Sequence, residues 1–173
     1  MKYKIVRLLD GDGTWNEFEN DWRAQCETHQ ENFDDYASGA FSVVRDLVVA
    51  EEENAGVFAF NVDGRHTSFC QLNRAALPGY DSPVLRARHL THCPDLDFGD
   101  HPIEAYIECL ASAFGGILAA SDHRPGFLSK HINLHLRSPT DRQFFKMLGK
   151  GLNEEDEFES VQTRGSWLYV TKA

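Results

Sequence analysis

Apolar residues recur along this chain with two different spacings. Helical spacing, about every third or fourth position, predicts amphipathic helices over 14–30, 36–52, 102–120 and 139–149. Short runs or alternation predict strands over 3–9, 57–60, 67–72, 84–93, 131–136, 158–162 and 167–170. The elements therefore follow the order strand, helix, helix, three strands, helix, strand, helix, two strands. We expect a single α/β (α+β) domain over residues 1–173, with a mixed sheet of about seven strands and about four helices.

Local signals refine two helix starts and leave one segment ambiguous. Thr14 and Glu17 have the spacing of a capping box, which predicts a helix that begins with Thr14 as its cap. Ser138 followed by Pro139 and Asp141 predicts the start of the last helix in the same way. The paired valines within 36–52 also allow a strand there.

Charge and composition exclude several classes of protein. The chain has 17 Lys and Arg against 27 Asp and Glu, a net charge of −10, which disfavours a nucleic-acid partner. We see neither a signal peptide nor an apolar run approaching membrane-spanning length, so we expect a cytoplasmic protein without a membrane partner. The cysteines are irregularly spaced and are expected to be buried free thiols: Cys26, Cys70, Cys93 and Cys109.

One segment carries a family resemblance. Residues 138–149, SPTDRQFFKMLG, are similar to the motif N-x-x-A-x-x-F-Y-x-x-L-G-F of the GNAT N-acyltransferase superfamily, and 167–172 resembles the closing strand of such domains. The element order resembles this superfamily over nearly the whole chain. The resemblance implies a sheet that opens between its fourth and fifth strands, an acyl-CoA or acyl-carrier co-substrate and a small amine acceptor. It implies no metal, and the oligomeric state stays open, a homodimer included.

The chain departs from the family pattern at two places. The family's loop Q/R-x-x-G-x-G/A corresponds to the segment 95–102, where Leu96, Gly99 and His101 fill the motif positions among three aspartates. The family's frequent tyrosine acid is replaced by Phe145. A non-catalytic domain of this fold that binds a ligand or a partner is therefore the alternative. Residues 71–72, 83–85 and 88 more weakly resemble the acyl-homoserine-lactone synthase branch.

Candidate site residues follow from residue chemistry and from the resemblance. His92 and His135 near the strand ends are candidate general bases, with a non-catalytic histidine as the alternative for each. Arg86 and Arg88 share one face of a strand and could bind a substrate carboxylate or phosphate, or pair with the protein's own carboxylates. The resemblance places the cofactor-binding residues at Cys93, Phe98, Gly99, Asp100, His101 and Phe145.

A metal site was weighed against these assignments. The chain offers His89, His92, Cys93, His131 and His135 as nitrogen and sulfur donors. His89 and His92 face opposite ways on a regular strand, and His131 and His135 lie about 13 Å apart along theirs. We therefore expect no metal.

Overall fold

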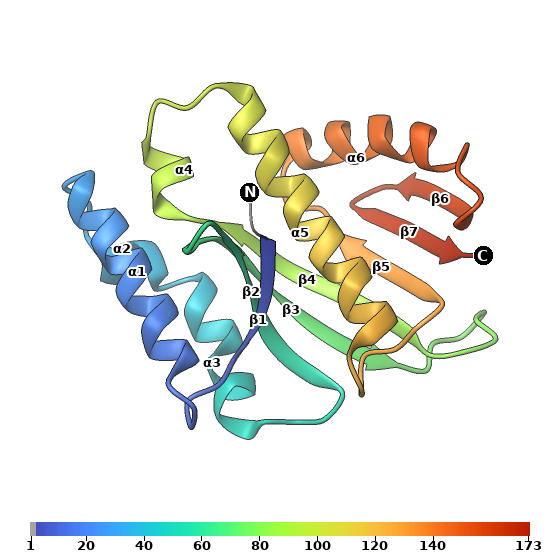
Figure 1. Ribbon diagram of the computed structural model, residues 1–173, viewed down its shortest axis with the longest axis horizontal. Coiled ribbons are helices and arrows are strands. Elements are labelled where there is room, and N and C mark those ends of the chain that lie inside the picture. Colours follow the sequence, from blue (N-terminus) through green and yellow to red (C-terminus); the bar gives the residue numbers. More distant parts are fainter. Residues whose placement is uncertain (1–2) are drawn as a thin grey trace.

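The computed structural model describes residues 3–173, whose strands form one mixed sheet (Figure 1). Its spatial order is β1-β2-β3-β4-β5-β7-β6, and every neighbouring pair is antiparallel except β4 and β5, which are parallel. The expected α/β class with a seven-stranded mixed sheet is confirmed. The strands are β1 (Tyr3–Leu8), β2 (Ala55–Val62), β3 (Arg65–Ala75), β4 (Val84–His92), β5 (His131–His135), β6 (Phe158–Arg164) and β7 (Trp167–Lys172).

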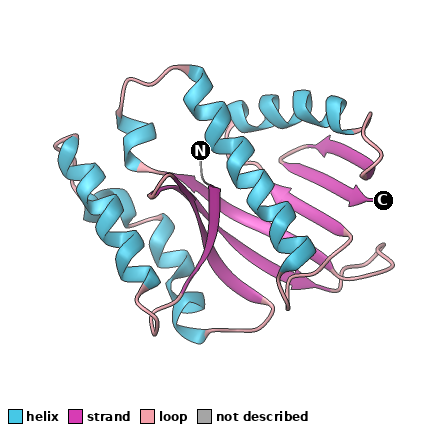
Figure 2. Cartoon of the chain, in the orientation of Figure 1, coloured by secondary structure: helices cyan, strands magenta, loops and turns pink. Residues whose placement is uncertain are grey.

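The described residues also form six helices, two of them only five residues long (Figure 2). The predicted helix over 36–52 is two helices, because the side chain of Asn32 caps a short first helix and the chain turns at Ser38-Gly39. The strand alternative there is wrong. A short helix that begins at Pro94 was not predicted. The helices are α1 (Thr14–Thr28), α2 (Phe33–Ala37), α3 (Ala40–Ala50), α4 (Pro94–Phe98), α5 (Ile103–His123) and α6 (Pro139–Leu152).

The two predicted helix caps have opposite outcomes. The cap of α1 is Gly13, with φ 81°, and no side chain caps this helix. Thr14 Oγ1 instead donates to Asp12 Oδ1 at 2.6 Å and accepts a 2.8 Å bond from the Leu9 amide, both outside the helix, so the capping box predicted there is wrong. At α6 the predicted serine cap is confirmed: Asp141 N donates to Ser138 Oγ at 3.0 Å, and Ser138 N donates to Asp141 Oδ2 at 3.2 Å, which completes a capping box.

Helices cover the two faces of the sheet unequally. One face is packed against α5 and α6, and its core includes Leu85, Leu110, Ile132 and Phe145. On the other face α1, α2 and α3 pack against the β1–β3 part of the sheet through a second core around Trp22 and Phe69. Figure 1 shows α5 crossing one side of the sheet, while α1–α3 lie beside the β1–β3 part of the sheet, away from β6 and β7. Much of the second face of β4, β5 and β7 is therefore left without a helical cover.

The length of α5 contradicts the expectation that no apolar segment approaches membrane-spanning length. With 21 residues, α5 is long and apolar enough to cross a membrane by length and composition, although we expected no segment to approach that limit. Here its buried side, including Leu110, Phe114 and Ile117, packs into the core against the sheet. All four cysteines are free and buried, as predicted.

Candidate functional site

The parallel strands β4 and β5 separate part of the way along their length. They pair from Val84 opposite His131 to Ala87 opposite Leu134, and no further. Beyond this point β4 continues to His92 while pairing only with β3 on its other side. The free edge of β4 and the end of β5 thus bound a wedge in the sheet, where an extended ligand could find unpaired backbone groups.

A β-bulge lies at the start of this wedge. Gln71 pairs with Arg88 and Phe69 pairs with Thr91, so Cys70 alone stands opposite two residues of β4, one of them His89. His89 has φ 57°, in the left-handed region that residues with a Cβ seldom adopt. Such strain is often kept at functional sites, and a bulge leaves backbone groups outside the ladder. The bulge therefore marks the wedge as a candidate site.

A polar cluster lies on the helix-covered side of the wedge. His92 at the end of β4 approaches two side chains: its Nδ1 is 3.4 Å from Cys109 Sγ, and its Nε2 is 3.8 Å from Asp141 Oδ1. Tyr106 donates a 2.5 Å hydrogen bond to Asp141 Oδ1, and its ring packs edge-on against the imidazole. These contacts join β4, α5 and α6 where the two helices begin.

The electrostatics of this cluster determine the charge of His92. Burial lowers the pKa of His92, but its interactions with Asp141 and Cys109 outweigh burial and raise that pKa to about 9. Burial raises the pKa of Asp141, and its interaction with His92 and its hydrogen bonds from Tyr106 and Ser138 more than reverse this, so the net pKa is lowered. His92 is therefore protonated at neutral pH, which suits an ion pair better than the general-base role predicted for it.

A second cluster, on the open side of the wedge, is basic. It consists of Arg86, Arg88, His89, His135 and Arg137, and we call it the basic cluster. The two β4 arginines and Arg137 alternate with buried residues, so their side chains leave the helix-covered face. The Arg86 guanidinium lies 5.7 Å from the ring centre of Trp167, and the His135 ring packs at 4.8 Å on the same indole. Of the two β4 arginines predicted to bind substrate, Arg88 lies at the start of the wedge near His135, and Arg86 lies just before it, where β4 still pairs with β5.

The histidines of the basic cluster carry the opposite charge state to His92. Burial lowers the pKa of His135, and the charges of Arg137 and Arg88 lower it further. The pKa of His89 is lowered by burial and by the same two arginines. Both rings are therefore neutral near pH 7 and able to accept a proton. In active sites, groups whose environments push their pKa values apart often serve as the acid and the base. Because His135 is neutral and His92 is protonated, His135 is the better candidate base of the two predicted histidines.

The predicted cofactor loop borders a pocket at the mouth of the wedge. This pocket has a volume of about 410 Å³ and lies between the first turns of α5 and α6, lined by Leu96, His101, Pro102, Ile103, Tyr106, Ser138 and Thr140. Of the predicted cofactor-binding residues only His101 lines it. Gly99 serves a structural need, because a Cβ there would lie 2.5 Å from the Asp95 carbonyl oxygen. Asp100 is exposed nearby.

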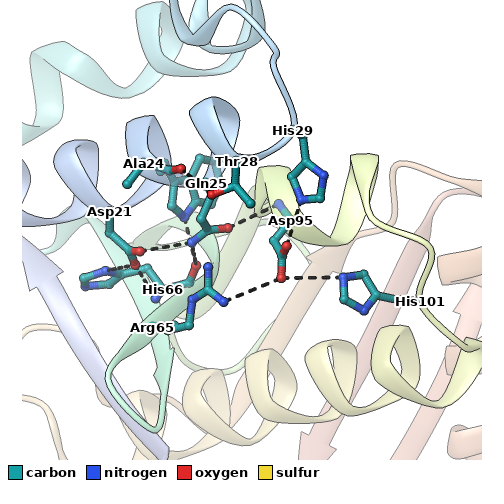
Figure 3. A network of polar contacts seen from close by, with 10 residues as sticks. Asp21, Ala24, Gln25, Thr28, His29, Arg65, His66, Asp95 and His101 are labelled. Carbon is teal, nitrogen blue, oxygen red and sulfur yellow. Dashed lines mark hydrogen bonds and ion pairs between the residues drawn. The ribbon is translucent and has the colours of Figure 1, made fainter.

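Two of the three aspartates of this loop make contacts within the protein, and Figure 3 shows those of Asp95. Asp95 is 2.8 Å from His29, 3.5 Å from His101 and 3.8 Å from Arg65, and its amide donates to Gln25. The hydrogen bond from His29, first among these, outweighs burial and lowers the pKa of the Asp95 carboxyl. Asp97 accepts a 2.8 Å hydrogen bond from Tyr36. The network holds α4 against α1. The aspartates of this segment therefore stabilise a short helix where the family has a glycine-rich loop.

Three other predicted cofactor-binding residues lie outside this pocket. Phe98 packs on Tyr36, and Cys93 lines a separate pocket of about 190 Å³ that also reaches Cys109 and His101. Burial raises the pKa of the Cys93 thiol to about 12. Phe145 is fully buried among core side chains, so it offers a ligand no surface. The contact of these residues with a cofactor stays a prediction.

Sequence reasoning did not assign site roles to several residues that the fold brings to the wedge: His89, Tyr106, Cys109, Arg137 and Asp141. They come from separate elements, and neighbours in the sequence do not reveal such contacts. One signal was present, since Asp141 stands at the alanine position of the family motif. Among residues 3–173, no three His, Cys, Asp or Glu side chains are grouped so as to hold a metal ion.

No protein-family model and no curated protein sequence matches this chain. Among solved structures it is similar to a probable N-acyltransferase from Enterococcus faecalis V583, with 13% identity over 84% of this chain and 32% of that chain, at a TM-score of 0.41. It is also similar to FdhC, a nucleotide-linked sugar GNAT, with 8% identity over 97% of this chain and 84% of that chain, at a TM-score of 0.49.

A further similar structure is FeeM, an N-acyl amino acid synthase from uncultured soil microbes, with 12% identity over 99% of this chain and 88% of that chain, at a TM-score of 0.46. The chain spans about a third of the Enterococcus protein. At these identities the likeness concerns the fold alone. The element order and the mixed sheet in which β4 separates from β5 are those that the GNAT resemblance implies, so the chain has a GNAT-like fold.

Proposed function

We propose that this protein is an N-acyltransferase that moves an acyl group from a thioester, acyl-CoA or acyl-carrier, to a small amine. The observation that carries the proposal is the wedge, which combines an unpaired strand edge, a strained bulge and a neutral histidine. Each of these suits one requirement of acyl transfer: a binding site for the donor, backbone groups near the carbonyl and a base for the amine.

The donor would enter through the pocket between the starts of α5 and α6. Its amide-containing arm could pair with the free edge of β4 as an added strand would. The start of α5 has Pro102 as its cap and no capping side chain, and Pro102 and Ile103 line the pocket. The Ala105 amide donates to the Pro102 carbonyl, so the donor would have to use the amides of the first two helical residues. His101, Ile103 and Thr140 would contact the arm. The pocket lining contains neither Lys nor Arg, so affinity for a highly charged donor would be modest.

The acceptor would approach the bulge from the open face. In this scheme the amine nitrogen attacks the thioester carbonyl, a C–N bond forms and the C–S bond breaks. His135 takes the proton that the amine gives up. The thiolate leaves readily, since thiols have a pKa of only about 8.5, and it then takes a proton from water, so little acid catalysis is needed. This removes the requirement for a tyrosine at the place of Phe145.

The proposal is tested by donor binding in a variant that fills the pocket. Thr140 is exposed and lines the pocket, so Thr140→Trp should block entry without disturbing the core, whereas Met147→Trp, exposed on the same helix, should not. We expect acetyl-CoA or a longer acyl-CoA to raise the melting temperature of the wild type and of Met147→Trp, but not of Thr140→Trp.

The outcomes separate the proposal from its alternative. Binding to the wild type followed by amide formation with an amine panel supports acyl transfer. Saturable binding without turnover of any amine would favour a non-catalytic binding domain, for which the altered loop at 95–102 and Phe145 at the place of the family's tyrosine are the supporting features. Absence of binding with every CoA and carrier-protein donor would contradict the proposed donor site.

A further inference from the structure

The basic cluster lacks counterions of its own. Among the described residues 3–173, no carboxylate lies within 4.0 Å of Arg86, Arg88 or Arg137, although aspartates and glutamates outnumber lysines and arginines in the chain. By contrast, Arg23, Arg45 and Arg65 each have a carboxylate partner. The sequence left two roles open for Arg86 and Arg88, substrate binding and pairing with the protein's own carboxylates. The absence of nearby carboxylates among the residues that the structure describes argues against the second role.

The hydrogen-bonding capacity of these guanidiniums is also largely unused. Arg88 Nε is buried without a partner, and its Nη2 has only a 3.5 Å contact with Asn73 Oδ1. Arg137 donates one bond, to Thr91, and Arg86 lies over Trp167. A guanidinium carries five donors in a planar fork that matches carboxylate and phosphate oxygens. Three such groups on one open face leave most of these donors free for a ligand.

The cluster also has an electrostatic cost that an anion would relieve. Burial and the neighbouring charge of Arg86 lower the pKa of Arg88, and no anionic group opposes them. Like charges held together in a partly buried site repel each other strongly, since water screens them poorly there. A bound anion reverses this repulsion and supplies the missing acceptors, which is how arginine clusters recognise carboxylates and phosphates.

We propose that the basic cluster binds a carboxylate or phosphate group of the amine acceptor, so that the preferred acceptor is an anionic amine. That the bound molecule is an acyl acceptor rests on the proposed acyl transfer. That the cluster binds an anion does not. Arg137 extends from the end of β5 to Thr91 on β4, so an anion held by Arg88 and Arg137 would lie over the wedge. The amine of the same molecule would then lie beside His135, whose pKa these two arginines lower.

Binding of matched small molecules tests the proposal without requiring turnover. The probes are glycine with its amide glycinamide, and O-phosphoethanolamine with ethanolamine, followed by isothermal titration calorimetry. We expect the carboxylate or phosphate member of at least one pair to bind and its partner without that group to bind at least tenfold more weakly. Glycine and phosphoethanolamine distinguish a carboxylate from a phosphate ligand. Higher ionic strength should weaken the binding.

Variants assign the binding to the arginines. Arg137→Ala removes an exposed side chain, and Arg88→Lys keeps the charge of a half-buried side chain but loses the fork; each should weaken anion binding at least tenfold. Lys146→Ala, which changes the net charge equally on the exposed side of α6, should leave it unchanged. Equal binding of the two members of both probe pairs, or no effect of either arginine variant, would overturn the proposal.

Two further results keep this proposal distinct from the proposed function. Anion binding without acyl transfer to any amine would leave the anion site standing and remove the acyltransferase. Acyl transfer to neutral amines at a rate that Arg137→Ala does not change would leave the acyltransferase standing and remove the anion site. If Arg137→Ala weakens acetyl-CoA binding while no anionic amine binds, the cluster recognises the donor's phosphates, and the acceptor proposal is wrong.

Discussion

Arg137 donates a 3.1 Å hydrogen bond to Thr91, and this bond joins the chain beyond β5 to β4 after the two strands have separated. The guanidinium thus spans the wedge on its open face. Its charge, with that of Arg88, adds to burial in lowering the pKa of His135. One side chain therefore both bridges the wedge and, after burial, contributes to the lowered pKa of the proposed base.

This relationship predicts how His135 responds to the loss of Arg137. In Arg137→Ala the imidazolium of His135 is no longer repelled by a nearby cation, so its pKa should rise toward the usual value of about 6.5. An NMR titration of the His135 ring measures this directly. The signal of His123, which is exposed at the end of α5 and outside the basic cluster, is the internal control for effects of the substitution that are not local. An unchanged pKa of His135 would show that burial alone lowers it.

His135 itself should control the pH dependence of turnover. A base must be neutral to act, so activity should fall as the pH drops through the lowered pKa of His135, below about 6.5. His135→Gln should reduce kcat by about 10²–10⁴-fold, with a smaller deficit at alkaline pH, where free amine no longer needs a base. A uniform loss at every pH would instead indicate a packing role on Trp167.

The His92–Asp141 pair predicts a pH-dependent stability. The folded pKa of His92, about 9, lies above the unfolded value of about 6.5, so its stabilising contribution is complete below about pH 6.5 and is lost as the pH rises through about 9. Denaturant unfolding across this range should show a decline in the free energy of unfolding that His92→Gln abolishes and His123→Gln preserves. A decline that persists in His92→Gln would contradict the account.

Asp141 is expected to matter more for stability than an ordinary surface carboxylate. Its side chain is 3% exposed and accepts bonds from Tyr106 and from the backbone of Ser138. Asp141→Asn leaves the imidazolium of His92 without its counterion and should destabilise the fold by on the order of 3 kcal/mol at neutral pH. Lys146→Ala on the same helix should stay within about 0.5 kcal/mol of wild type. Equal losses of stability in Asp141→Asn and Lys146→Ala would show that the His92–Asp141 pair has no special structural role.

Two glycines give a matched test of the loop before α5. In Gly99→Ala the new Cβ would meet the Asp95 carbonyl oxygen and the His101 ring, both at 2.5 Å, and we expect a loss of about 1–3 kcal/mol. In Gly151→Ala no neighbouring atom lies within 4 Å, and the helix should gain up to about 1 kcal/mol. Thermal unfolding of both variants decides whether the loop conformation is as tightly fixed as the structure shows.

The fold followed from the sequence more fully than the site did. Alternation in 131–136 and helical spacing in 102–120 are local patterns, and each produced the element that the pattern predicts. The cap at Thr14 failed because its hydroxyl bonds with Asp12 and with the Leu9 amide before the helix, contacts that the capping-box spacing does not reveal. The same limitation hid the site: His92 depends on Asp141, 49 positions later, and His135 on Trp167 in another strand.

The most direct test of the central claim is the stoichiometry of one reaction mixture. Wild-type protein with an acyl-CoA and an anionic amine should release free thiol and form N-acyl amide in a one-to-one ratio, and His135→Gln should slow both together. Amide formation that requires the protein and is lost in Thr140→Trp would support acyl transfer in the wedge. Thiol release without amide, or no release with any acyl-CoA or acyl-carrier donor, would contradict it.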